Sequence, residues 1–286
     1  MNNSNPNLSD AIASSRNLNL SGWEYGDEQV GSFFLDAING DEWFNFSSKN
    51  YPVPDKLDSR HWLQIEDQGP LPSCIGHGFT SAVEVVAYLQ TAGVIQLNRM
   101  FCYREAQKKD RLGRGQGATM GSAYKVIREG LPLESVWPYS KNYPRSIPKK
   151  CYEDRPYKIK NAVRLRGAEQ VTDWILGGQG AVVAGTAWTK GMDADRDLDR
   201  FRGGSRGGMH GHHCYMFFDW EKKNGEYWIR LYNSWSKRWG DKGTKLCSPR
   251  FLDELSEHHA SILYGLTDLE GAEPRTIDFR EDSVFK

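Results

Sequence analysis

One cysteine occupies a position that favours chemical reactivity. Cys74 follows Gly-Pro-Leu-Pro-Ser at the predicted start of a helix. The N-terminal end of a helix stabilises an anion, so we expect the pKa of this thiol to be lowered toward the thiolate. The structural alternative is a small buried hydrophobe, the usual role of a free cysteine. Cys102, Cys151, Cys214 and Cys247 have no comparable position.

A catalytic thiolate needs a base and a group that orients the base. His213 lies 139 residues after Cys74 and is predicted to open an apolar strand, HCYMFFDW. Asn233 lies at the end of the next predicted strand, across a hairpin indicated by Asn224-Gly225. The hairpin would bring the two side chains together, so that the amide holds the imidazole. The structural alternative for His213 is a surface or satisfied histidine.

The histidine cluster also suggests a metal site, but the spacing argues against one. His212 and His213 would point to opposite faces of a strand, and no acidic residue has suitable spacing. The five cysteines contain no CxxC pair, which disfavours structural zinc and predicts a reducing compartment or at least one free thiol. We therefore expect no metal and no cofactor.

The overall composition is that of a packed globular protein. Hydrophobic residues make up 38% of the 286 residues, and Lys+Arg equals Asp+Glu at 37 each. This balance argues against general attraction to nucleic acid or to a membrane surface. The Arg- and Gly-rich stretch 200–208 is interpreted as a flexible insertion. No apolar run reaches the ~18 residues of a membrane span, and residues 1–20 lack the apolar core of a signal peptide. We expect a soluble protein, cytoplasmic or released by an unconventional route.

Composition divides the chain into three regions. Residues 1–50 form an N-terminal extension that begins with an Asn- and Ser-rich stretch, predicted to be disordered, and continues with seven aromatic residues between Trp23 and Phe46. Residues 51–266 are globular throughout, and residues 267–286 form a charged tail. The aromatic segment is expected to pack on the globular body, because water disfavours so many exposed rings.

Hydrophobic spacing predicts helices first and strands afterwards. Ile75 to Leu89 follow a helical pattern that Gly93 can end, and a second helix is predicted over residues 120–128. Strands are predicted later in the chain, over 181–188, 214–220 and 227–235. This order indicates the α+β class, arranged as two lobes.

These motifs, in this chain order, resemble the papain family of cysteine peptidases. The residues that carry the resemblance are Asp-Gln-Gly-Pro (67–70), Ser-Cys-Ile-Gly (73–76), Gly-His-His-Cys-Tyr-Met (211–216) and Tyr-Trp-Ile-Arg-Leu-Tyr-Asn-Ser-Trp-Ser-Lys-Arg-Trp-Gly (227–240). Between them, Gly130 and Trp-Pro-Tyr (137–139) are similar to the element that follows the family's second helix. The similarity spans residues 51–266.

The resemblance implies a papain-like fold with a helical lobe, a β-rich lobe and the active-site cleft between them. It implies a cysteine endopeptidase in which Cys74 is the nucleophile, His213 the general base and acid, and Asn233 the residue that orients the imidazole. Gln68 and the backbone N–H of Cys74 would form the oxyanion hole. Trp235 matches the indole that shields the His–Asn hydrogen bond from water.

Substrate contacts and partners follow from the same resemblance. The stretch that lines the substrate cleft corresponds to Gly117, Ala118, Thr119 and Met120. The expected partner is a peptide or protein substrate, with no nucleic acid and no membrane. Residues 1–50 are expected to regulate the enzyme by covering part of the cleft, or else to patch an apolar surface elsewhere. Ile75, where the family has tryptophan, is one of several departures that resemble bacterial-type members and leave the specificity pocket open.

Two other classes of function remain open. A catalytically altered papain-like scaffold would only bind proteins, but the intact Gln68, Cys74, His213 and Asn233 argue against it. An acyl-transfer enzyme of the transglutaminase type would use the same Cys–His chemistry. Such enzymes typically have an aspartate as the third member, so Asn233 favours a peptidase.

Overall fold

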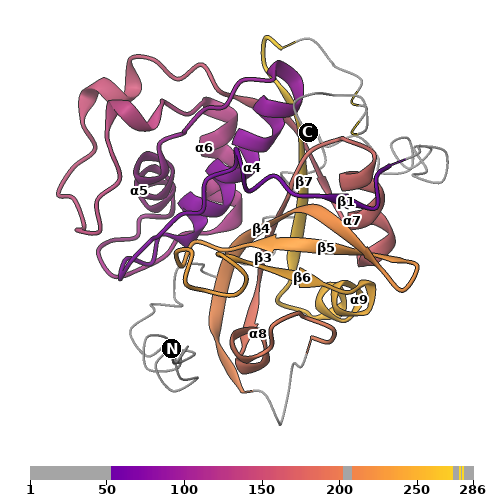
Figure 1. The fold of residues 1–286 in the computed structure, drawn as a ribbon. Coiled ribbons are helices and arrows are strands. Elements are labelled where there is room, and N and C mark those ends of the chain that lie inside the picture. The colour runs from indigo at the N-terminus through magenta and orange to yellow at the C-terminus, as the bar shows by residue number, and fades with distance from the viewer. Residues whose placement is uncertain (1–52, 202–207, 273–276, 278, 280–286) are drawn as a thin grey trace, which may run out of the picture.

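The computed structural model describes residues 53–201, 208–272, 277 and 279, which form two lobes (Figure 1). One lobe is helical and the other is built on an antiparallel sheet, so the predicted α+β, two-lobed fold is confirmed. The N-terminal extension 1–50, most of the insertion 200–208 and most of the tail 267–286 lie outside the described residues.

The helical lobe is built around one long buried helix. α4 (Cys74–Thr91) is buried from Cys74 to Leu89, because α5 (Arg99–Asp110), α6 (Met120–Glu129) and the sheet all pack against it. A helix that is apolar on every side is typical of a core position. The predicted helices are therefore confirmed, although α4 ends at Thr91 and its C-cap is Ala92 rather than Gly93. α5 was not predicted.

The second lobe contains a seven-stranded sheet within the described residues. Its order is β2-β7-β3-β4-β5-β6, and β1 pairs with β4. The strands are β1 (Lys56–Leu57), β2 (Ile159–Arg164), β3 (Val182–Thr189), β4 (Met209–Lys223), β5 (Glu226–Tyr232), β6 (Thr244–Cys247) and β7 (Ile262–Leu269). β7 extends three residues beyond the predicted boundary at 266, because it pairs with β2 along that length.

Shorter helices complete the structure. In the described residues of the β-rich lobe these are α7 (Gly167–Leu176), α8 (Lys190–Ala194) and α9 (Pro249–Glu257), with α7 packed on α9. Two 3₁₀ turns, η2 (Glu134–Val136) and η3 (Lys149–Tyr152), belong to the long segment between α6 and β2 (Figure 1).

The β4–β5 hairpin positions most of the predicted site. Its turn is the predicted Asn224-Gly225, and both residues have the positive φ (52° and 87°) that a tight hairpin turn requires. The prediction that His213 opens the strand is wrong, since β4 begins at Met209. The extra residues pair with the end of β3. β5 ends at Tyr232, so Asn233 lies just beyond the strand.

A buried ion cluster ties the helical lobe to the segment that leads into α4. Arg99 is only 1% exposed, and its Nη2 lies 2.6 Å from Oε1 of Glu66 and 3.1 Å from Oε1 of Glu84. Its Nη1 lies 3.9 Å from Oε2 of Glu134. Burial raises the pKa of all three carboxyl groups despite the attraction of Arg99, and that of Glu84 reaches about 7.

This cluster predicts a pH-dependent stability. Glu84 loses its proton near pH 4.5 when unfolded but only near 7 when folded, so its contribution to the free energy of unfolding is present below 4.5 and falls as the pH rises to 7. Glutamine does not titrate, so Glu84→Gln removes this contribution to the pH dependence of stability. Urea unfolding should show the parent losing stability relative to Glu84→Gln between pH 4.5 and 7. Glu129→Gln, at an exposed carboxylate, is the control. The prediction would be contradicted if the difference in the free energy of unfolding between the parent and Glu84→Gln stayed constant from pH 4.5 to 7.

Candidate active site

Cys74 is the first residue of α4 and has no exposed surface. The loop before it is held by Tyr139, whose hydroxyl donates to the carbonyl oxygen of Gln68 (2.9 Å) and lies 2.6 Å from Oγ of Ser73. The Cys74 sulfur accepts hydrogen bonds from the backbone N–H groups of Ile75 and Cys214. Because Cys214 directly follows His213, the bond from Cys214 brings the sulfur next to the strand that carries the predicted base.

The electrostatics of the thiol differ from the prediction. Burial raises the pKa of Cys74 to about 12, and the backbone N–H groups offset this only in part. The predicted lowering by the helix N-terminus is therefore wrong for this structure. The N–H groups do point at the sulfur, but the loss of hydration outweighs them. The thiol is protonated at neutral pH.

His213 is fully buried and bonded to Asn233. Its Nε2 lies 2.8 Å from Oδ1 of Asn233, an oxygen that also accepts from the backbone N–H of Ser234 (2.7 Å). Since Oδ1 can only accept, Nε2 carries the proton, and Nδ1 has no hydrogen-bond partner among the described residues. Burial lowers the pKa of His213 to about 4, opposed by the Asn233 bond. The imidazole is thus neutral, with a free lone pair on Nδ1.

Gln68 lies next to the same turn as Asn233. It is 1% exposed, so its amide is buried rather than solvated. Its Oε1 accepts from Oγ of Ser234 (2.7 Å), and its Nε2 donates to the carbonyl oxygen of Leu71 (2.9 Å). Its backbone N–H donates to the carbonyl oxygen of Ser234 (2.8 Å). The loop before Cys74 is therefore fixed to the segment that carries the orienting amide.

Two tryptophans enclose the imidazole. The Trp235 ring lies 4.5 Å from that of His213, with the planes at 31°. Trp188, from β3, lies 5.0 Å away at 81°. Trp235 had been expected from the sequence, whereas Trp188 had not. Its only sequence signal is a large aromatic residue at the end of an apolar strand opposite the histidine strand.

The predicted substrate-lining residues lie beside β4, but most of them are buried. Gly117, Ala118 and Met120 are buried, while Thr119 is partly exposed and caps α6 by accepting from the Ser122 N–H. Sδ of Met120 lies 3.9 Å from Sγ of Cys214, next to the predicted base. The stretch is therefore close to the site, and Thr119 alone of the four presents partly exposed surface.

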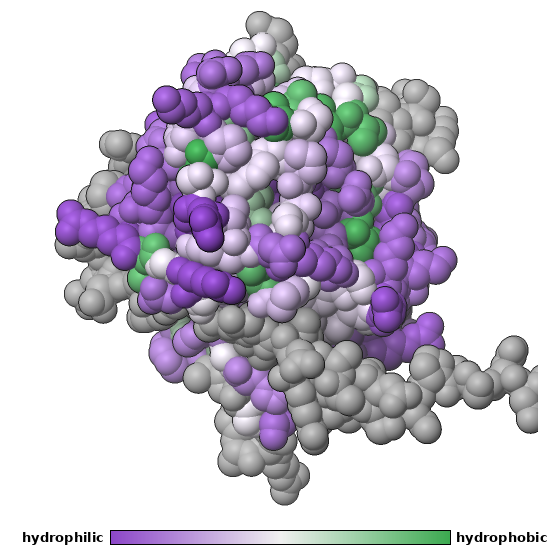
Figure 2. Space-filling view, turned by 90° about the vertical axis from the view of Figure 1, so that its left-hand side faces the viewer, coloured by the Kyte–Doolittle hydropathy of each residue, from purple (hydrophilic) through white to green (hydrophobic). Residues whose placement is uncertain are grey.

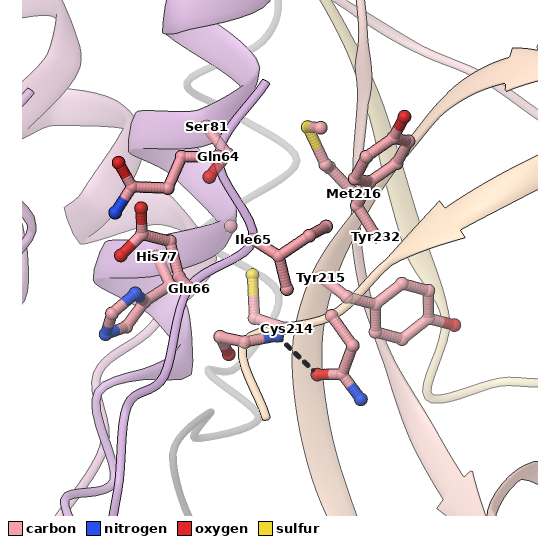
Figure 3. A pocket seen from close by; sticks show the side chains of 12 residues that line it. Gln64, Ile65, Glu66, His77, Ser81, Cys214, Tyr215, Met216 and Tyr232 are labelled. Atoms are coloured by element: carbon pink, nitrogen blue, oxygen red, sulfur yellow. Dashed lines mark hydrogen bonds between the residues drawn. The ribbon is translucent and has the colours of Figure 1, made fainter. Parts of the chain in front are cut away.

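A small cavity lies between α4 and the sheet (Figure 3). Its volume of about 20 Å³ admits roughly one water molecule and excludes a peptide. Figure 3 shows His77 beside Glu66 on the α4 side and Tyr215 on the sheet side. His77 is 2% exposed, and neither ring nitrogen has a hydrogen-bond partner among the described residues. Burial lowers its pKa, so it is neutral.

A larger groove of about 510 Å³ opens on the outer side of the helical lobe. It is lined by side chains of α5 and the 146–152 segment, among them Arg104, Lys108 and Tyr152, and by none of the predicted site residues. Figure 2 shows this side of the molecule, where strongly hydrophilic side chains dominate and hydrophobic ones form small separate spots. The groove is therefore separate from the Cys74 site.

The remaining sequence predictions concern metals, thiols and membranes. All five cysteines are free and buried, which confirms a free thiol. Nδ1 of His210 lies 3.1 Å from Oδ2 of Asp193, and the described part of the chain has no cluster of three or more residues suited to a metal ion. None of its helices combines the length and apolarity needed to cross a membrane.

Sequence comparison identifies the family. The profile described as "Papain family cysteine protease" matches residues 53–249, more than half of the chain. The chain belongs to this family. It is a cysteine peptidase and therefore a hydrolase.

Solved structures share the fold at low sequence identity. Xylellain, a cysteine protease from Xylella fastidiosa, is 18% identical with a TM-score of 0.64, covering 76% of this chain and 87% of its own. The clostridial cysteine protease Cwp84, after propeptide cleavage, is 17% identical with a TM-score of 0.61, covering 77% and 58%. Procathepsin L 3 of Tenebrio molitor is 18% identical with a TM-score of 0.59, covering 91% and 90%. No curated protein sequence matches significantly.

Proposed function

We propose that this peptidase is an endopeptidase that hydrolyses peptide bonds through Cys74, His213 and Asn233. The observation that carries the proposal is the 2.8 Å bond between Nε2 of His213 and Oδ1 of Asn233. This bond leaves Nδ1 without a described partner, while the neighbouring Cys214 N–H binds the Cys74 sulfur. Nucleophilic catalysis by a thiol requires a nearby base that is held in place by a third group and can accept the proton of the thiol. His213, held by Asn233, meets these requirements in the proposed mechanism.

The chemistry proceeds from a neutral pair. Because the pKa of the thiol lies far above that of the imidazole, the proton moves from sulfur to Nδ1 as the sulfur attacks the peptide carbonyl. Nε2 of Gln68 and the backbone N–H of Cys74 stabilise the oxyanion. The imidazolium then protonates the leaving amine, and the acyl-enzyme forms. Water, deprotonated by His213, releases the acid and restores the thiol.

The nucleophile is tested by removing its sulfur. Cys74→Ala should abolish peptide hydrolysis and labelling by an epoxide-type peptide inhibitor, because the reaction then has no sulfur nucleophile at the start of α4. Cys102→Ala is the matched control, since Cys102 is also fully buried and burial also raises its pKa to about 12. Hydrolysis by Cys74→Ala at the parental rate would overturn the mechanism. Product analysis with an added amine separates hydrolysis from acyl transfer, and a predominant amide product would indicate the transfer enzyme.

Substitutions of the three supporting residues, His213, Asn233 and Gln68, should reduce activity to different extents. His213→Ala should approach the loss seen for Cys74→Ala, because the proton then has no acceptor. Asn233→Ala should cost less, since the imidazole still reaches the thiol in some orientations. Gln68→Ala should lower kcat by about 10²-fold, the usual effect of losing one oxyanion donor. Steady-state kinetics on one peptide substrate measures all three. A fatal His210→Ala with an active His213→Ala would show that the wrong histidine was assigned.

Residues 1–50 are proposed to regulate the site by covering part of the cleft. Two observations support this role. Structures similar to this chain include proenzymes, among them procathepsin L 3 of Tenebrio molitor. Cys74 is 0% exposed, so a substrate carbonyl can reach the sulfur only after the part of the chain that covers the sulfur is displaced.

Truncation tests this regulation. Removal of residues 1–46 should speed inhibitor labelling of Cys74 and extend labelling to lower pH, because solvent that reaches the sulfur lowers the thiol pKa from about 12. Labelling rates across pH, measured beside circular dichroism of both proteins, provide the comparison. A folded truncation with the parental rate and pH profile would rule out covering of the cleft. An unfolded truncation would favour the structural patch instead.

A further inference from the structure

Trp188 packs against the predicted catalytic imidazole and is fully buried. Its ring lies 5.0 Å from that of His213 and 5.0 Å from that of Trp235. Relative to the imidazole, the Trp188 plane is nearly perpendicular (81°) and the Trp235 plane is inclined by only 31°. The imidazole is thus confined by two indoles in different orientations.

Asp193 fixes the Trp188 ring. The indole N–H donates to Oδ1 of Asp193 at 2.9 Å. Oδ2 of the same carboxyl group lies 3.1 Å from Nδ1 of His210, and the Asp193 backbone carbonyl accepts from Nζ of Lys245 at 2.9 Å. Asp193 sits on α8, which begins directly after β3 and is capped by Thr189. The carboxyl group therefore has little freedom to move away from the indole.

We propose that Asp193 and Trp188 are positioning residues for His213. The inference rests on the proposed function, in which His213 is the base. Asn233 supplies a single hydrogen bond to the imidazole, and a single bond leaves the ring free to swing about its Cβ–Cγ axis. The indole, held by Asp193, blocks that motion, so that Nε2 keeps its bond to Asn233 and Nδ1 keeps the orientation that the proposed function requires.

Trp220 provides a matched control for the loss of an indole N–H. It is also fully buried, and its Nε1 donates to the carbonyl oxygen of Pro54 at 2.8 Å. It lies on β4, the strand of His213, but its described ring neighbour is Phe279 rather than the imidazole. Trp188→Phe and Trp220→Phe therefore remove equivalent bonds, and only the first is near the site.

The kinetic test compares these variants in the full chain. Trp188→Phe should lower kcat on a peptide substrate by about tenfold while KM stays within about twofold, because the substrate still binds but the base is misaligned. Trp220→Phe should leave kcat within about twofold of the parent. Asp193→Ala should resemble Trp188→Phe, and Asp193→Asn should recover most of the rate, since its amide oxygen still accepts the indole N–H. Equal losses in the two tryptophan variants, or no recovery with Asp193→Asn, would overturn the proposal.

A second readout does not depend on peptidase activity. The imidazole resonances of His213, followed by NMR across pH, should shift in Trp188→Phe and Asp193→Ala and stay unchanged in Trp220→Phe. Unchanged His213 resonances in Trp188→Phe would overturn the positioning role whatever the chemistry of the site. If no variant and no parent protein hydrolyses peptides while these resonances shift as expected, the proposed function fails and the positioning of His213 stands.

Discussion

The pairing of β4 with β5 is the constraint on which the site depends. The last paired residues are Met216 and Tyr232, so the chain leaves the sheet at Asn233 and can turn back toward His213. The same departure brings Ser234 to Gln68 through a side-chain bond and a backbone bond. One hairpin end thus brings Asn233 to His213 and Ser234 to the loop before Cys74. A slip of one residue in this register would turn the side chains of β5 to the other face of the sheet and move Asn233 relative to His213.

Burial, rather than the helix terminus, sets the protonation states in this structure. It raises the pKa of Cys74, lowers that of His213 and raises those of the carboxyl groups around Arg99. In each case the charged form loses hydration that its hydrogen bonds do not fully replace. The site at rest is consequently neutral, with a protonated thiol beside an imidazole that can take the proton.

Local patterns predicted the elements that carry the site, and tertiary contacts decided the rest. The apolar pattern of α4 and the Asn224-Gly225 turn predicted elements of both lobes, and the resemblance to the papain family selected Cys74, His213 and Asn233 as the candidate site. α5 was missed because its sequence mixes buried and charged residues. Its buried Arg99 is stable there only because Glu66, Glu84 and Glu134 arrive from three separate segments. No short-range pattern contains that information.

The same limit applies to the thiol pKa and to the second tryptophan. A sequence identifies a cysteine at a helix start, but the extent of its desolvation depends on every segment that packs over it. Trp188 lies close to His213 because β3 and β4 pair with Thr186 opposite His213. Its indole N–H is bound by Asp193 because α8 turns back directly after the strand.

Access to the sulfur and its acidity are physically linked. The groups that leave Cys74 without exposed surface are those that deprive its thiolate of hydration. Any movement that admits a substrate also admits solvent or the polar carbonyl of the substrate, and each stabilises the developing negative charge. If Cys74 is the nucleophile as proposed, a single displacement that exposes its sulfur also lowers the pKa of its thiol.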